Sequence, residues 1–357
     1  MDSLLPSIIV TGATGVVGRN FLGAAKEKFL IYGIARRSQS EAGIPCHPNI
    51  RWLQADIADF NTLKSRILGN IDKYKQGKPS VDFILHLASY YDYNYSPHIE
   101  YERTNVNGTH HMLELSKLLN IKRFVFASSL AAMRFPPKGE KVTEVYPVSA
   151  SHPYAESKRK GEALVREYST FFPCSIVRPA AVFTDWCEYT LLYYFLKRWL
   201  SSKWGGNMLC GKGECAIPFI HAHDLNNLLL ILLNESTRLP VFDVYIAGHD
   251  GSTSNRELFH AATSLYFERD IKPRMLPMWF AVPLIVIRDI FMCLCGKRPF
   301  ERPWMLKYVD RKLEIDSSYT RKVLSWEPDP QMHILRRMKI IIENFKNYPD
   351  EMVRFNL

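Results

Sequence analysis

The stretch from Ser7 to Gly18, SIIVTGATGVVG, joins an apolar strand-like run to a glycine-rich turn, and a helical segment follows it. In such a unit, Gly12 permits the tight turn, Gly15 lets a pyrophosphate approach the backbone, and Gly18 allows close packing of helix on strand. The first turn of the helix offers N–H donors and a partial positive charge to an anion. The stretch therefore predicts a dinucleotide-binding site, with a purely structural turn as the alternative.

Strand-like and helix-like segments alternate over the first half of the chain. The strand-like runs are short and rich in Ile, Val, Leu and Phe, as in strands that are buried on both faces of a parallel sheet. They are Ser7–Thr11, Leu30–Ala35, Arg51–Ala55, Val81–Leu87, Ile121–Ala127 and Cys174–Arg178. Helical patterns, such as those of residues 100–119 and 154–170, lie between them. We therefore expect an α/β fold with a doubly wound parallel sheet.

This alternation weakens at about Thr184, where aromatic residues become frequent. We expect a dinucleotide-binding domain over residues 1–183 and a smaller mixed α/β substrate lobe over residues 184–357. The chain near residues 215–250 is expected to return to the first domain.

Composition excludes several classes of protein. The 357 residues are 47% hydrophobic and 23% charged, which excludes wholesale disorder. The net charge of +10 suits an anionic cofactor, a membrane surface or nucleic acid, but no nucleic-acid-binding motif accompanies it, so we expect no nucleic-acid partner. The seven cysteines contain no C-x-x-C pair, which argues against a disulfide framework or zinc site and favours a reducing, cytoplasmic location.

The end of the second expected strand indicates which dinucleotide is bound. An NAD site usually has Asp or Glu there, whereas this chain has Ala35 followed by Arg36 and Arg37. Guanidinium groups pair well with phosphate and would suit the 2′-phosphate of NADP. We therefore expect NADP(H), with NAD(H) and a simple solvated basic loop left open. Asp56, after the third strand, is expected to accept from the adenine amino group.

A tyrosine and a lysine lie four residues apart, at Tyr154 and Lys158, and hence on one face of a helix. An ammonium group beside a phenol favours the phenolate, so Lys158 is expected to lower the pKa of Tyr154. Such a tyrosine exchanges a proton with an alcohol or a carbonyl while a nicotinamide moves hydride. The strand Phe124–Ala127 ends in Ser128 and Ser129, where a hydroxyl would polarise the carbonyl oxygen.

Further short motifs follow the glycine-rich turn. They are ADI at Ala55–Ile57, HLA at His86–Ala88, NVNGT at Asn105–Thr109, ASS at Ala127–Ser129, PYAESK at Pro153–Lys158, VRP at Val177–Pro179, PFIHAHD at Pro218–Asp224 and LSWEP at Leu324–Pro328. Over about residues 7–330 the chain resembles the extended short-chain dehydrogenase/reductase family of the epimerase/dehydratase type. The region around residues 276–295 is similar to that of 3β-hydroxysteroid dehydrogenase-like members.

This resemblance implies a Rossmann domain, a homodimer, and Ser129, Tyr154 and Lys158 as the catalytic set. Lys158 would also bond the nicotinamide ribose, and Ser129 matches the family's active hydroxyl better than Ser128. The residues expected to bind the cofactor are Gly12, Thr14, Gly15, Val16, Val17, Gly18, Arg36, Arg37, Asp56, Ile57, Leu87, Ala88, Ser89, Asn105, Tyr154, Lys158, Pro179 and Ala180.

Two departures from the family pattern concern the substrate. Ile217 stands where members acting on nucleotide sugars commonly carry an arginine that clamps the diphosphate. The glycine usual after the R-P-x-x-V motif is absent from residues 182–186. We therefore expect an oxidoreductase for a secondary alcohol or ketone of a fairly apolar small molecule, with a sugar-nucleotide epimerase or dehydratase as the alternative.

Aromatic residues crowd two segments. One holds Trp186, Tyr189, Tyr193, Tyr194, Phe195, Trp199 and Trp204, and the other Tyr90, Tyr91, Tyr93 and Tyr95. About half are explained by ordinary core packing; the rest would wall the substrate, for which we predict Tyr91, Ser129, Trp186 and Tyr189.

An apolar segment over residues 276–295 is flanked by basic residues, and its longest uncharged part is shorter than the roughly 20 residues of a membrane-spanning helix. It suits a peripheral membrane contact or the cover of a lipophilic pocket, and a helix buried in the substrate lobe is an equal alternative. His221 and His223 would point to opposite faces of a strand, so no metal site is expected.

Overall fold

The structure is a computed structural model that describes residues 5–71, 74–75, 77–92, 96–201, 205–296 and 301–356. Its central sheet has seven parallel strands in the order β13-β8-β7-β6-β1-β2-β3. Their bounds are β1 Ser7–Thr11, β2 Leu30–Ala35, β3 Ile50–Gln54, β6 Phe83–His86, β7 Arg123–Ala127, β8 Cys174–Pro179 and β13 Phe242–Ala247. The expected doubly wound sheet is confirmed. The strand order switches between β1 and β6: the chain adds β2 and β3 on one side of β1 and the later strands on the other. Ligands bind at such a switch point in this kind of sheet.

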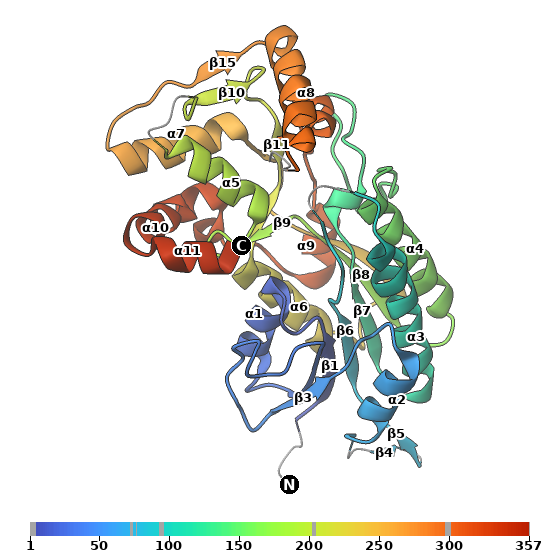
Figure 1. Cartoon of the computed structure of the whole chain (residues 1–357). Coiled ribbons are helices and arrows are strands. Elements are labelled where there is room, and N and C mark those ends of the chain that lie inside the picture. The colour runs from blue at the N-terminus through green and yellow to red at the C-terminus, as the bar shows by residue number, and fades with distance from the viewer. Residues whose placement is uncertain are drawn as a thin grey trace.

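Helices cover both faces of the sheet (Figure 1). Ile8 and Val10 point to the face covered by α1 (Val16–Ala25), α6 (Ala222–Asn234) and α9 (Ser318–Leu324). Ile9, between them, points to the face covered by α2 (Phe60–Leu68), α3 (Gly108–Leu118) and α4 (Pro153–Tyr168). Because strand residues alternate between faces, one continuous apolar run supplies both cores.

The helical segment expected over residues 100–119 has an irregular first half. Residues Tyr101–Asn107 form a π-helix, η1, whose end is marked by a hydrogen bond from Gly108 N–H to Arg103 O, five residues back, and α3 follows it. Short π-helices often occur at functional sites. Here the wider turn contains Asn105, whose contacts are described below.

A second lobe lies above the sheet in Figure 1. Its core is formed by α5 (Thr190–Trp199), α7 (Asn255–Phe267), α10 (Ile334–Asn347) and α11 (Pro349–Asn356). The short strand β10 (Met208–Cys210) pairs with β15 (Arg274–Leu276), and α8 (Met278–Leu294) follows at the upper edge. The remaining elements are β4 Tyr74–Lys75, β5 Lys78–Pro79, β9 Ala181–Phe183, β11 Ala216–Ile217, β12 Phe219–His221, β14 Thr253–Ser254, η2 Leu130–Ala132, η3 Pro303–Tyr308 and η4 Pro330–Met332.

The chain passes between the two parts several times. Residues of α6 and β13 pack with the sheet, and so do Ile315, Leu324 and Trp326 from near the end of the sequence. The division into residues 1–183 and 184–357 remains a prediction. Of the helices in the described part of the chain, none is both long and apolar enough to cross a membrane.

The predicted strand through His221 and His223 is wrong. Strand β12 ends at His221, which caps α6 by accepting from His223 N–H through its Nδ1 at 3.1 Å. In the described part of the chain, no three His, Cys, Asp or Glu side chains are arranged to hold a metal ion.

Candidate active site

The glycine-rich turn lies at the start of α1 and leaves one face open. Gly12 has φ of +68°, and a Cβ there would lie 2.7 Å from Ala88 N. A Cβ on Gly18 would lie 2.3 Å from the Gly12 carbonyl oxygen. Gly15, the exposed N-cap of α1, is different, because a Cβ there would meet only Gly12 O at 3.4 Å. The protein itself requires glycine at 12 and 18, whereas glycine at 15 keeps the helix N-terminus accessible, which fits a dinucleotide pyrophosphate.

A buried histidine, His86, holds the loop that faces this turn. Thr11 Oγ1 accepts from the two backbone N–H groups that follow His86, at 3.2 and 3.1 Å, and donates to His86 Nδ1 at 2.7 Å. His86 Nε2 then donates to Thr109 Oγ1 at 3.0 Å, and Thr109 donates to Asn105 O at 2.6 Å. Burial, assisted by the charge of Lys158, lowers the pKa of His86 to about 3, so the ring is neutral.

Asn105 fixes the same loop from the side of the π-helix. Its side-chain oxygen accepts from Tyr90 N–H at 2.6 Å, and its amide nitrogen donates to Tyr90 O and to Ser157 Oγ, each at 2.9 Å. The amide thereby joins the loop after β6 to α4. Asn105 is buried, and these contacts within the protein give it a positioning role beside the predicted cofactor contact.

The two predicted arginines lie on the surface at the end of β2. The side chain of Arg36 is 67% exposed and lies 3.9 Å from Glu100, while Arg37 is also exposed. Arg103, which belongs to none of the sequence motifs, donates to Asp56 and to Glu100. Burial alone would raise the pKa of Asp56, but the N–H of Ala58 and Arg103 hold that pKa below its usual value.

The acceptor atoms of Asp56 and Ile57, which are predicted to contact the cofactor, already have partners within the protein. Asp56 Oδ1 accepts from Ala58 N–H at 2.9 Å, and its Oδ2 accepts from Arg103. Ile57 is buried in the core, and its carbonyl oxygen accepts from His111 at 2.9 Å. Both residues lie at the end of β3, and their predicted contact with the cofactor remains a prediction.

Tyr154, Lys158 and Ser129 meet at the carboxyl end of β7. The helix α4 begins with His152 as N-cap and Pro153 in its first turn, so Tyr154 lies in that turn and Lys158 one turn later. Lys158 Nζ donates to Ala127 O at 2.8 Å and lies 5.7 Å from the centroid of the Tyr154 ring. Tyr154 also hydrogen-bonds with Ser129, and all three predicted catalytic side chains line one cavity.

Burial dominates the protonation of this group. It raises the pKa of Tyr154 to about 12, although hydrogen bonding with Ser129 and Ser89 lowers it in part. It lowers the pKa of Lys158 to about 7, with Glu162 acting in the opposite direction. The predicted lowering of the Tyr154 pKa by Lys158 is therefore wrong for the free protein, because a buried phenolate loses its hydration and the groups that lower this pKa in part are Ser129 and Ser89.

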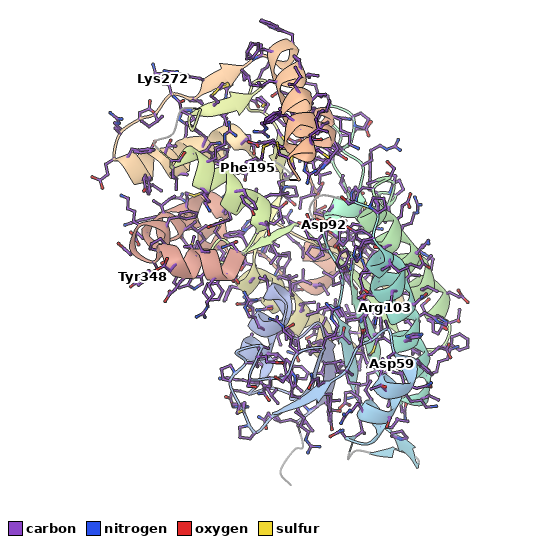
Figure 2. All side chains as sticks on the ribbon, in the orientation of Figure 1. Asp59, Asp92, Arg103, Phe195, Lys272 and Tyr348 are labelled. Carbon is purple, nitrogen blue, oxygen red and sulfur yellow. The ribbon has the colours of Figure 1, made fainter. Side chains whose placement is uncertain are left out.

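A cavity of about 430 Å³ opens beside these three side chains. Predicted site residues on its wall are Val17, Leu87, Ser89, Tyr91, Ser129, Tyr154, Lys158, Pro179, Ala180 and Tyr189. Ser128 also lines it, and its buried hydroxyl has no hydrogen-bond partner among the described residues. Phe195 of α5, labelled in Figure 2, lines the cavity from the second lobe.

Several wall residues were not predicted. Trp304, Met305 and Tyr308 come from η3, more than a hundred residues after the catalytic helix, and His152 comes from the turn before it. The ring of His152 is fixed by Ala155 N–H on one nitrogen and Ala131 O on the other, and burial lowers its pKa to about 4. Its position before Pro153 was the signal that could have identified it.

Trp186, predicted to contact substrate, does not line this cavity. Its ring lies 5.4 Å from that of Phe355 and 6.0 Å from that of Tyr348, which follows α10 (Figure 2). The aromatic packing of α11 therefore holds it outside the cavity. The predicted wall residues Tyr93, Tyr95 and Trp204 lie outside the described residues.

Charged neighbours of Trp186 attach the same segment to both parts of the protein. Asp185 accepts from Arg337 Nε of α10 at 2.8 Å, and Glu188 pairs with Arg19 of α1. Burial would raise the pKa of Asp185, but His221 and Arg337 lower it to about 2. The segment between β9 and α5 is thus fixed by ion pairs at both ends.

Comparison with known proteins shows the family to which the chain belongs. The model of the NAD dependent epimerase/dehydratase family matches residues 8–248. A dTDP-D-glucose 4,6-dehydratase of Dictyostelium discoideum is 22% identical over 278 residues, which are 72% of this chain and 61% of that enzyme's length. A 3 beta-hydroxysteroid dehydrogenase/Delta 5→4-isomerase of Vaccinia virus (strain Copenhagen) is 26% identical over 159 residues, 41% of this chain and 42% of that enzyme.

A solved structure shares the fold. The dTDP-glucose 4,6-dehydratase of Bacillus anthracis, in complex with NAD, has a TM-score of 0.70 at 18% identity, covering 98% of this chain and 99% of that one. The family whose model matches residues 8–248 consists of enzymes that use a nicotinamide cofactor. The chain belongs to the NAD dependent epimerase/dehydratase family, within the extended short-chain dehydrogenase/reductases.

Proposed function

We propose that the protein is an NADP(H)-dependent oxidoreductase that interconverts a ketone and a secondary alcohol on a fairly apolar small molecule. The observation that carries the proposal is the cavity beside Tyr154. Among its described wall residues Lys158 is the one charged side chain, because His152 is neutral at pH 7. Most of the others are apolar or aromatic, as in sites for lipophilic ligands.

The roles of the three polar side chains follow from their protonation. With a pKa of about 12, Tyr154 carries its proton at neutral pH and is ready to donate it to a carbonyl oxygen. Ser129 donates a hydrogen bond to the same oxygen and stabilises the charge that develops there. The ammonium form of Lys158 stabilises the phenolate left on Tyr154. A bound nicotinamide would supply the hydride for reduction or accept it in oxidation.

The residues at the end of β2 support a preference for NADP(H) over NAD(H). Ala35 offers no carboxylate to a ribose 2′-hydroxyl, and the guanidinium of Arg36, which is exposed and lies 3.9 Å from Glu100, can turn toward a 2′-phosphate. An exposed ion pair with this separation stabilises the observed position of Arg36 very little. NADP(H) is therefore preferred and NAD(H) remains an accepted alternative.

A sugar-nucleotide epimerase or dehydratase is the second candidate, and the dTDP-glucose dehydratases among the relatives favour it. A diphosphate requires cationic partners, usually arginine. Ile217 lies on the cavity wall at the position where the family's nucleotide-sugar enzymes commonly have arginine. This apolar side chain supports the first candidate over the second.

The decisive experiment compares substrates with the same enzyme preparation. NADPH oxidation, followed by absorbance, is measured with a panel of hydrophobic ketones, and turnover of UDP-glucose and dTDP-glucose is followed by chromatography. We expect activity with the ketones. Turnover of the sugar nucleotides alone would reject the proposal in favour of the second candidate.

We further propose that the protein is cytoplasmic, as its cysteine pattern favours, and that it forms a homodimer, as the resemblance implies. Sedimentation velocity with the full chain measures the oligomeric state. A monomer at all concentrations would overturn the second part.

A further inference from the structure

The helix α8 presents an apolar side to solvent. Ala281 and Ile285 are its buried residues, whereas eight large apolar side chains of the same helix are exposed. They are Trp279, Phe280, Val282, Leu284, Ile287, Ile290, Phe291 and Leu294. Except for Val282, they recur at spacings of one, three and four residues and therefore form one stripe along the helix.

The two charged residues of α8 point away from this stripe. Arg288 Nη2 donates to Glu301 Oε2 at 2.7 Å, and Asp289 lies 3.8 Å from Arg302. An ordinary surface helix has the reverse arrangement, with apolar residues toward the core and charges toward water. The polarity of α8 therefore suits an apolar medium on its outer side.

The same helix adjoins the candidate active site. It packs against η3, and Trp304, Met305 and Tyr308 of η3 line the cavity. In Figure 1, α8 stands at the outer edge of the second lobe, remote from most of the sheet. The element η3 therefore connects α8 to the wall of the cavity that holds Tyr154.

Basic residues flank the helix. Lys272, on the edge of the second lobe (Figure 2), and Arg274 are both exposed just before it, and Lys297 and Arg298 follow it in the sequence. A membrane surface with anionic headgroups complements such flanks. A second copy of this chain does not, because a symmetric contact through α8 would bring like charges near each other.

We propose that α8 lies in the interface of an anionic lipid membrane, and that the substrate is a lipophilic ketone or alcohol taken from that membrane through the η3 side of the cavity. The statement on the substrate rests on the function proposed above. The membrane contact does not, since it follows from the surface of α8 and its flanking charges.

Vesicle binding tests the contact. Full-length protein is sedimented with vesicles of phosphatidylcholine, alone or mixed with phosphatidylglycerol. We expect binding that is stronger with phosphatidylglycerol, and that Phe291→Ser weakens by about tenfold, as for the loss of one inserted aromatic side chain. Phe171→Ser is the matched control, because Phe171 and Phe291 are both 62% exposed but Phe171 follows α4; it should bind as the unmodified protein does.

Depth of insertion gives a second readout. Acyl chains carrying bromine should quench part of the tryptophan fluorescence, and Trp279→Phe should remove most of that quenching. Absence of vesicle binding, or quenching that survives Trp279→Phe, would overturn the proposal. So would a concentration-dependent dimer that Phe291→Ser abolishes, since a second copy would then cover α8.

The route of the substrate is tested separately. With a lipophilic ketone carried in vesicles, kcat/KM should fall for Phe291→Ser about as much as vesicle binding does, whereas a water-soluble ketone should be reduced equally by both proteins. Equal kcat/KM with the vesicle-borne ketone would refute uptake through α8. Vesicle binding without reduction of any ketone would instead refute the proposed function and leave the membrane contact standing.

Discussion

Replacing Lys158 by methionine removes a charge from a buried position without leaving a large cavity. Lys158 is 4% exposed, and burial lowers its pKa from 10.5 to about 7. The fold therefore disfavours the ammonium form, and this penalty is fully present below pH 7, where the folded and unfolded chains both carry the proton. It diminishes as the pH rises from 7 towards 10.5. We expect Lys158→Met to stabilise the fold near pH 6.

The size of the effect follows from the same values. At about 1.4 kcal/mol for each pKa unit, the difference between 10.5 and about 7 corresponds to at most about 5 kcal/mol at pH 6. The variant also loses the hydrogen bond of Lys158 to Ala127 O at 2.8 Å, which costs about 1 kcal/mol. At pH 9 the penalty in the unmodified protein is only about 2 kcal/mol. The advantage of the variant should thus shrink by about 3 kcal/mol between pH 6 and pH 9.

Urea unfolding of both proteins at pH 6 and pH 9 measures this difference. Lys160→Met is the matched control on the same helix, since Lys160 is 55% exposed and its pair with Glu102 is on the surface. The control should change the free energy of unfolding by less than about 1 kcal/mol at either pH. If Lys158→Met were destabilised equally at both pH values, the ammonium group would not be desolvated and the reasoning would fail.

Three further predictions concern the site. Tyr154→Phe should lower NADPH-dependent turnover by at least about 10²-fold, because the proton donor is lost. Tyr168→Phe, which also replaces a buried tyrosine of α4, should leave kcat/KM nearly unchanged, and activity that survived Tyr154→Phe would contradict the assigned role. Arg36→Ala should weaken NADPH binding about tenfold in a fluorescence titration and leave NADH binding unchanged, because the exposed guanidinium would contact only the 2′-phosphate. Equal losses of affinity for NADPH and NADH would show that Arg36 does not bind the 2′-phosphate. His86→Phe should lower the free energy of unfolding by about 2–4 kcal/mol in urea, since Thr11 and Thr109 lose a buried partner, and no loss would mean that the relay is not stabilising.

The sheet was predictable because its signals are local. Runs such as Ile8–Val10 are buried on both faces, and the spacing of Gly12 and Gly18 reflects the close approach of Gly18 to the Gly12 carbonyl oxygen within one turn. The pair Tyr154 and Lys158 was predictable for the same reason, because residues four apart share a helix face.

Other parts of the site depend on contacts between distant segments. Trp304 and its neighbours reach the cavity only through the path of the second lobe, which no periodicity records. Trp186 was misplaced for the opposite reason, since the packing of Phe355 of α11 outweighed its proximity in sequence to Tyr189. The π-helix over Tyr101–Asn107 was also missed, because its sequence has an ordinary helical pattern and tertiary hydrogen bonds of Asn105 accompany the wider turn.

The segment between β9 and α5, held through Asp185 and Glu188, has a consequence for how substrates are selected. A connection that is ion-paired to both parts restrains the spacing at which the two parts meet the ligand. Discrimination then depends on the shape of the wall, and side chains such as Phe195 set the widest molecule that is admitted. Similar chains that accept different substrates should therefore differ in the size of the side chains on that wall. The spacing of their two parts should be the same.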